Sequence, residues 1–106
     1  MNYHFIAIGG AVMHNLALEL QHNAHHITGS DDEIFEPAKS RLNNAGLLPD
    51  QAGWFPEKIH PNLDGIIVGM HAKQDNPELQ RTWSWAFLPT VFLNLFTIML
   101  NRKHDW

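Results

Sequence analysis

Short apolar runs that stop at glycine recur along the first two thirds of the chain. Residues 3–8 are aromatic or aliphatic apart from one histidine and stop at Gly9 and Gly10, a pattern that predicts a buried strand followed by a turn. Residues 26–28 begin a second, shorter run of this kind. Residues 63–69 contain a continuous apolar run, which is typical of a strand inside a parallel sheet. The pattern therefore predicts three strands.

The segments between and after these strands carry the signals of helices. Small and aliphatic side chains over residues 11–21 indicate a helix that packs closely on a sheet. Pro37 is suited to the first turn of a second helix, and Gly46 is suited to its end. The Asp-Asn-Pro-Glu sequence at 75–78 is typical of the cap and acidic first turn of a third helix. A strand followed by a helix, three times over, predicts an α/β domain whose helices cover a small parallel sheet.

The C-terminal segment does not continue this alternation. Residues 82–101 form a run of twenty residues without a charge, flanked by Arg81 on one side and by Arg102 and Lys103 on the other. This length and flanking make the run a formal candidate for a membrane span. Its proline and its polar side chains argue against a membrane span, and a buried C-terminal helix is the simpler interpretation. We therefore divide the chain into a domain at 1–81 and an atypical apolar tail at 82–106.

Composition narrows the class of protein. A chain of 106 residues with a net charge of −4 is a single domain without the basic face that nucleic-acid binding requires. It has no cysteine, which excludes disulfides, thiolate zinc sites and thiol catalysis. The N-terminus lacks the basic and long apolar regions of a signal peptide. We expect a cytoplasmic domain with no nucleic-acid or membrane partner.

Candidate chemistry falls where the predicted strands end. In open α/β sheets, ligands bind at the carboxyl ends of the strands, which places three loops at the site: 9–15, 29–32 and 69–76. The glycines of the first loop allow close approach of the backbone, and the following helix start suits a phosphate. Asp31 lies roughly 20 residues further on, where a dinucleotide-binding domain has the acid that binds a ribose hydroxyl. His71 and Asn76 in the third loop supply donors and acceptors.

Other parts of the chain are weaker candidates than these loops. His22, His25 and His26 suggest a metal, but they lack a carboxylate or cysteine companion at ligand spacing, so a solvated loop is favoured. The acidic segment at 31–36 contains carboxylates that suit Mg²⁺, but such a segment is more often a surface turn. A Gly-x-x-x-x-Gly-Lys-Ser/Thr phosphate loop is absent from the sequence. We therefore expect no metal site and no catalytic residue in this chain.

Three motifs together resemble a known family. HFIAIGGAVMHNLALEL, HITGSDDEIFEPAKSRLNNAGL and LDGIIVGMHAKQDNPEL occur in this order over about residues 1–81 and are similar to the N-terminal domain of the Mur ligases. Among these, UDP-N-acetylmuramate–L-alanine ligase and the murein tripeptide ligase are the most similar. The first loop of the family is richer in glycine, and here Val12 and Asn15 stand where it has two glycines.

The resemblance implies a Rossmann-like domain that binds the UDP part of a UDP-N-acetylmuramoyl ligand. It places the first loop on the diphosphate and the other two loops on the uridine. The implied ligand-binding residues are Gly9, Gly10, Ala11, Val12, Met13, His14, Asn15, Ser30, Asp31, Met70, His71, Ala72 and Asn76. The full-length family enzyme uses ATP and Mg²⁺ to join an amine to the muramoyl carboxylate. Because the ATP loop is missing here, we expect a truncated substrate-binding domain with no cofactor of its own and no turnover alone.

Two hypotheses remain open beside this one. The first is a generic NAD(P)-binding domain, which the spacing from the glycines to Asp31 favours. The second concerns the tail: read one base earlier, the codons of residues 82–87 permit Leu-Glu-Leu-Gly, closer to what the family has there. A one-base shift near Arg81 would then have produced the apolar tail and ended the chain before the ATP site. The exposed aromatic residues of such a tail would favour self-association.

Overall fold

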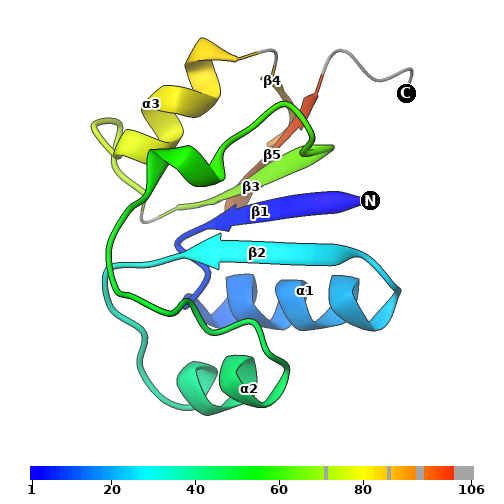
Figure 1. Cartoon of the computed structure of the whole chain (residues 1–106), viewed down its shortest axis with the longest axis vertical. Coiled ribbons are helices and arrows are strands. Elements are labelled where there is room, and N and C mark those ends of the chain that lie inside the picture. The colour runs from blue at the N-terminus through cyan, green and yellow to red at the C-terminus, as the bar shows by residue number, and fades with distance from the viewer. Residues whose placement is uncertain (71, 86, 93–94, 102–106) are drawn as a thin grey trace.

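The computed structural model describes residues 1–70, 72–85, 87–92 and 95–101, with the backbone alone at 91 and 92. One five-stranded sheet organises the fold, with helices on both faces (Figure 1). The strands are β1 (Asn2–Ile6), β2 (His26–Ser30), β3 (Gly65–Gly69), β4 (Phe87–Phe92) and β5 (Phe96–Asn101). The helices are α1 (Ala11–His22), α2 (Ala38–Asn44) and α3 (Pro77–Ser84), with a short 3₁₀ turn, η1 (Pro56–Lys58), before β3.

The sheet combines a parallel half with an antiparallel half. Its strand order is β2-β1-β3-β5-β4. The strands β2, β1 and β3 are parallel to one another, whereas β5 runs antiparallel to both of its neighbours, β3 and β4. The predicted alternation of strands and helices, and the small parallel sheet that it implies, are confirmed over the first 84 residues.

The buried C-terminal helix expected for the tail is not what forms. After α3, the described part of the tail forms the two strands of an antiparallel hairpin, β4 and β5. Pro89 lies in β4, an edge strand, where a missing N–H removes no essential bond, and the register shifts between Pro89 and Val91. None of the helices in the described part of the chain is long and apolar enough to cross a membrane.

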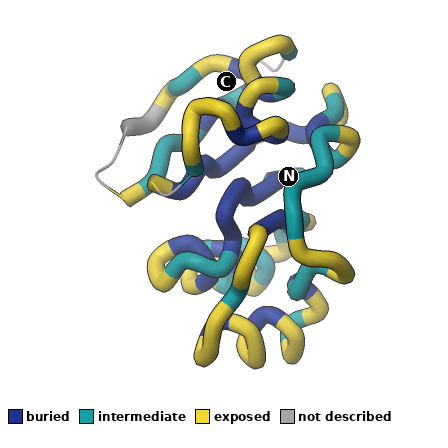
Figure 2. The backbone as a smooth tube through the Cα atoms, turned by 90° about the vertical axis from the view of Figure 1, so that its left-hand side faces the viewer, coloured by how far each residue is buried: buried dark blue, intermediate teal, exposed yellow. Residues whose placement is uncertain are grey.

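Successive residues of the central strands point to opposite faces and build two cores. Phe5 and Ile67 pack with α1 and α2 on one face. Ile6 and Ile66 pack on the other face with residues from the η1 region, α3 and β5. Figure 2 shows the central strands as the buried middle of the molecule, with exposed segments around it. A sheet covered on both faces explains why β3 is buried at every position.

Candidate functional site

The connections after β1 and β3 leave the sheet toward opposite faces. From β1 the chain passes to α1 on one face, and from β3 it passes to α3 on the other (Figure 1). A crevice opens at such a switch point because neither connection covers it. Here it is a cleft of about 480 Å³ between the ends of β1, β2 and β3. It is lined by Ala7, Gly9, Gly10, Ala11, Val12, Met13, Asp31, Asp32, Glu33, Phe35, Gly69, Met70 and Leu95.

The start of α1 forms one wall of this cleft. Gly10 is the N-cap, with extended backbone and no side-chain hydrogen bond to the helix. The next three residues, Ala11, Val12 and Met13, all line the cleft. Backbone N–H groups in the first turn have no partner within their own helix and carry the positive end of its dipole. This wall is therefore suited to an anionic group such as a phosphate.

Asp31 supports the glycine loop from behind. Its Oδ2 accepts a hydrogen bond from the Gly9 N–H at 2.8 Å, and its Oδ1 accepts one from the Glu33 N–H at 3.4 Å. A Cβ on Gly9 would lie 2.8 Å from Asp31 Oδ2 and 2.9 Å from Ile34 Cγ1, closer than such contacts allow. Glycine is thus required at position 9 by the packing of Asp31 and Ile34.

Burial gives Asp31 an unusual electrostatic setting. Only 8% of the residue is exposed, and burial raises the pKa of its carboxyl, with Asp32 adding to the rise and the Gly9 N–H opposing it. Two further acidic residues, Asp32 and Glu33, line the same cleft. No lysine or arginine lines this cleft within the described residues. An anion here would rely on the backbone dipoles of α1.

Part of the cleft wall is apolar. Val12, Phe35, Met70 and Leu95 line it, and each of these large side chains is more than a third exposed. The main chain ties Leu95 to this wall, because the Met70 N–H donates to the Leu95 carbonyl at 3.2 Å. A ring or another uncharged flat group fits such a surface, whereas hydroxyl or imide donors fit the carboxylate side.

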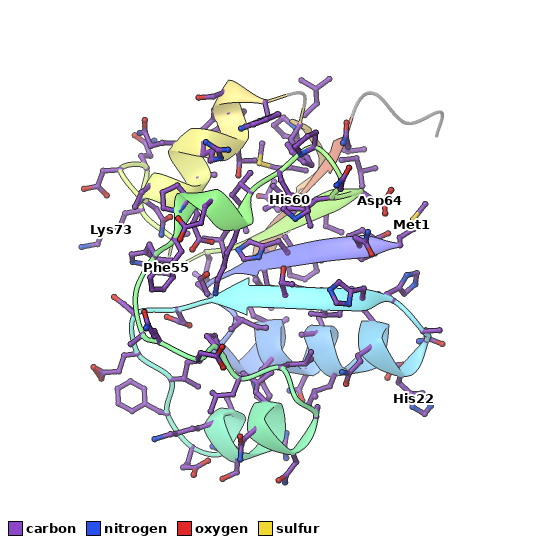
Figure 3. All side chains as sticks on the ribbon, viewed as in Figure 1. Met1, His22, Phe55, His60, Asp64 and Lys73 are labelled. Atoms are coloured by element: carbon purple, nitrogen blue, oxygen red, sulfur yellow. The ribbon has the colours of Figure 1, made fainter. Side chains whose placement is uncertain are left out.

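A second, smaller cleft adjoins the first. It measures about 340 Å³ and shares Ala7, Asp31 and Asp32 with the larger one. Its remaining lining residues are Trp54, Lys73, Asp75, Asn76 and Pro77. Figure 3 shows Lys73 and Phe55, the neighbour of Trp54, at the end of the sheet where β1 and β2 stop, and Met1 and Asp64 at the opposite end. The two clefts form one continuous depression along the carboxyl ends of the strands.

Most of the predicted binding residues reach this depression. Gly9 through Met13, Asp31 and Met70 line the larger cleft, and Asn76 lines the smaller one. Asn76 is buried, and its Oδ1 accepts the N–H groups of Glu78 and Leu79, so it caps α3. Ala72 packs against the core beneath. His71 lies outside the described residues.

Three other predicted residues lie beside the clefts rather than in them. His14 is buried, with its Nδ1 2.9 Å from the Gly10 carbonyl. The Asn15 Oδ1 accepts a hydrogen bond from the Arg41 guanidinium at 3.2 Å. Ser30 is fully buried, and its carbonyl accepts the N–H groups of Ala7 and Ile8 at 2.9 and 3.1 Å. His14 and Ser30 thus support the loops from the interior, whereas the Asn15 contact lies at the surface.

Sequence reasoning missed Phe35, Trp54, Lys73 and Leu95. Lys73 falls inside the third loop, 69–76, so its position was available from the predicted strand end. Trp54 and Leu95 come from a long connection and from the tail, where no motif marked them. In the described part of the chain, no group of three or more histidine, aspartate or glutamate side chains is placed to hold a metal ion. We therefore derive no step through Mg²⁺.

Comparison with known proteins shows which family the chain belongs to. No family model matches the chain. Over 77 residues, or 73% of the chain, it is 30% identical to the Escherichia coli UDP-N-acetylmuramate–L-alanyl-γ-D-glutamyl-meso-2,6-diaminoheptandioate ligase. It is 34% and 37% identical to the UDP-N-acetylmuramate–L-alanine ligases of Lactobacillus johnsonii and Carboxydothermus hydrogenoformans, over 80% and 72% of the chain. The chain belongs to the Mur ligase family.

Solved Mur ligase structures share the fold. A murein peptide ligase from Psychrobacter arcticus matches 79% of the chain with a TM-score of 0.69 and 28% identity. A UDP-N-acetylmuramate:L-alanyl-γ-D-glutamyl-meso-diaminopimelate ligase from Neisseria matches 78% of it with a TM-score of 0.68 and 21% identity, a likeness of fold alone. The chain spans only 16–20% of the length of the three curated relatives.

Proposed function

We propose that this chain is the N-terminal substrate-binding domain of a Mur ligase and that its clefts bind the UDP part of a UDP-N-acetylmuramoyl ligand. The observation that carries the proposal is the start of α1, whose first turn opens into the larger cleft. Membership of a family whose relatives are named for UDP-N-acetylmuramate supports the choice of ligand. The diphosphate would lie against Ala11, Val12 and Met13.

The rest of the ligand would follow the chemistry of the walls. Uridine carries hydroxyl and imide donors, and the carboxylates of Asp31 and Asp32, which border both clefts, are the available acceptors. Lys73 also lines the smaller cleft, shortly before Asn76 in the sequence. Because no cation lines the larger cleft among the described residues, we expect binding to weaken only modestly as salt increases.

We assign no catalytic step to this chain. In the family, ATP and Mg²⁺ activate the muramoyl carboxylate for amide formation. The 106 residues contain no phosphate loop for ATP. They would bind and orient the nucleotide end of the substrate, away from the bond that forms.

Calorimetric titration with UDP-N-acetylmuramate, UDP and NAD tests the proposal. Binding of the UDP compounds without NAD is the expected result, and ligand at 100 times its Kd should stabilise the fold by about 2.7 kcal/mol in a melting experiment. Binding of NAD alone would instead favour the generic dinucleotide-binding domain. If neither UDP compound binds, the proposal is wrong for this chain.

A pair of variants at Val12 isolates the electrostatic contribution. Val12 lines the cleft at the second position of α1 and is 38% exposed. Val12→Asp adds a carboxylate that the helix start stabilises but that repels a diphosphate, whereas Val12→Asn has nearly the same shape without the charge. We expect the Asp variant to bind UDP-N-acetylmuramate about tenfold more weakly than the Asn variant, a difference of about 1.4 kcal/mol. Equal affinities would place the diphosphate elsewhere.

A further inference from the structure

A histidine and a glutamate form a buried pair on the face of the sheet that α3 covers. His4 in β1 and Glu78 in the first turn of α3 are both completely buried. The His4 Nε2 lies 2.5 Å from the Glu78 Oε1. Replacing a buried pair of this kind by apolar side chains is often neutral or favourable for stability. The pair therefore calls for an explanation other than stability.

Both side chains are also bonded on their far sides. The His4 Nδ1 lies 2.7 Å from the Thr28 Oγ1, on β2. The Phe55 N–H donates to the Glu78 Oε2 at 2.8 Å. The chain of hydrogen bonds thus runs from β2 through β1 to α3 and on to the segment just before η1. Four parts of the molecule that are distant in sequence are joined by two side chains.

The proton positions follow from these partners. Burial lowers the pKa of His4, although Glu78 partly offsets this, and the lowered pKa favours a neutral imidazole. Burial raises the pKa of Glu78, but the hydrogen bond and the charge interaction with His4 and the Phe55 N–H lower it overall, which favours the carboxylate. A neutral imidazole that donates from Nε2 to the carboxylate must accept from the Thr28 hydroxyl at Nδ1.

The groups that face the pair come from every element around it. Lys58, in η1, and His60 oppose the protonation of His4. The Lys58 Nζ donates to the Gly29 carbonyl at 3.0 Å and lies 5.2 Å from the centre of the Phe55 ring. The Ser30 hydroxyl, on β2, favours the charged form of Glu78. The carboxylate is thus held in a fixed polar surrounding.

The residues next to this chain of hydrogen bonds line the smaller cleft. Trp54 precedes Phe55, and Asn76 and Pro77 precede Glu78. Glu78 therefore connects the Trp54 wall of the cleft to the α3 wall, and His4 anchors that connection to the sheet. Figure 3 shows Phe55 at the same end of the sheet as Lys73, which lines this cleft.

We propose that His4 and Glu78 are positioning residues that set the separation between Trp54 and the start of α3, and so the width of the smaller cleft. Neither residue lines a cleft or touches a ligand placed there. The effect on UDP-N-acetylmuramate affinity rests on the proposed function. The effect on the position of Trp54 does not.

The test compares a full apolar replacement with a conservative one. The double variant His4→Leu with Glu78→Met fills the space but leaves the Phe55 N–H without its acceptor. Glu78→Gln keeps an acceptor for Phe55 and can donate its amide to a His4 whose proton has moved to Nδ1. Leu79→Ala, next along α3, is the matched control, because it weakens packing in the same core without touching the pair.

Affinity is the first readout. The double variant should bind UDP-N-acetylmuramate about tenfold more weakly than wild type while remaining folded, whereas Glu78→Gln and Leu79→Ala should stay within about threefold. Wild-type affinity in the folded double variant overturns the proposal.

Two readouts by NMR do not depend on the ligand. The Trp54 indole resonance should move in the double variant and stay in place in Leu79→Ala, and the His4 proton should move from Nε2 to Nδ1 in Glu78→Gln.

If wild type fails to bind the UDP-sugar, the proposed function fails, and the Trp54 resonance alone decides on the positioning role. If the double variant does not fold, hydrogen exchange of the wild-type Phe55 amide decides: exchange as slow as in β1 supports the proposal, and fast exchange overturns it.

Discussion

Gly9 and Asp31 show that the first binding loop is held in shape by contacts with the second. The Asp31 carboxylate occupies the space that a side chain at position 9 would need. Gly9→Ala should therefore destabilise the protein by about 1–3 kcal/mol through overpacking. Gly10→Ala is the control, because its Cβ would meet Met13 Cγ at 3.4 Å and the Ala7 carbonyl oxygen at 3.8 Å, both ordinary van der Waals contacts. Urea unfolding of both variants checks this, and equal losses would contradict the steric explanation.

His4 should also make the stability depend on pH. Burial lowers its pKa below the ordinary 6.5, so between the folded pKa and 6.5 the unfolded chain binds a proton that the folded chain does not. Stability from this residue must then decrease as the pH drops below about 6.5, by at most about 1.4 kcal/mol per pH unit. The lowered pKa of Glu78 adds a further loss below its ordinary 4.5.

Urea unfolding at several pH values between about 7.5 and 5.5 measures this slope. The double variant His4→Leu with Glu78→Met should have a shallower slope than wild type, because it lacks the group that titrates. Parallel profiles for the two proteins would show that another group is responsible.

For single residues, the sequence predicted which ones lie near the site better than it predicted what each one does there. The glycines at 9 and 10, the acid at 31 and the asparagine at 76 could be placed near one another because parallel strands end at the same edge. Spacing alone could not show that Asp31 accepts the Gly9 N–H or that Asn76 caps α3. The His4–Glu78 pair was missed altogether, because its members are 74 positions apart and no periodicity links them.

Among the helices, α3 has the best-defined beginning. Asn76 accepts two backbone N–H groups at 2.9 and 3.3 Å, and Pro77 occupies the first position. Asn76→Ala should cost about 1–2 kcal/mol, because the two donors lose their acceptor at a buried helix end. Ser84→Ala at the exposed end of the same helix should cost less than about 0.5 kcal/mol. Thermal unfolding of the two variants compares them, and similar Tm values would argue against a structural cap.

Whole elements were predictable where local signals and global fold agree. The three parallel strands and three helices each have an apolar run or face of the correct length and a turn or cap residue at the correct end. The hairpin of β4 and β5 has neither, since an uncharged run of this length fits a helix or a strand equally well. What determines its structure is long-range: β3 offers an open edge, and β5 pairs with it from Gly65 to Gly69.

The stability of the whole molecule therefore depends on its C-terminal hairpin. Curated relatives align with 72–80% of the chain, whereas the sheet uses residues up to Asn101. Phe87 and Met99 pack in the same core as Ile66 and Val68 of β3. The α3 helix, Pro77–Ser84, crosses the boundary at residue 81 that the composition suggests. The tail thus completes the sheet that carries the binding loops.

Removal of residues 86–106 tests that dependence. The truncated chain would lose the burial of Phe87 and Met99, each worth about 1.5–3 kcal/mol, and would expose the edge of β3. We expect it to be at least about 3 kcal/mol less stable in urea and to associate through that edge at high concentration. Leu88→Ala, which shortens a half-exposed side chain on β4, should change stability by less than about 0.5 kcal/mol and leave the elution volume in size-exclusion chromatography unchanged. A truncated chain that remains monomeric with the wild-type unfolding midpoint would show instead that residues 1–85 fold without the hairpin.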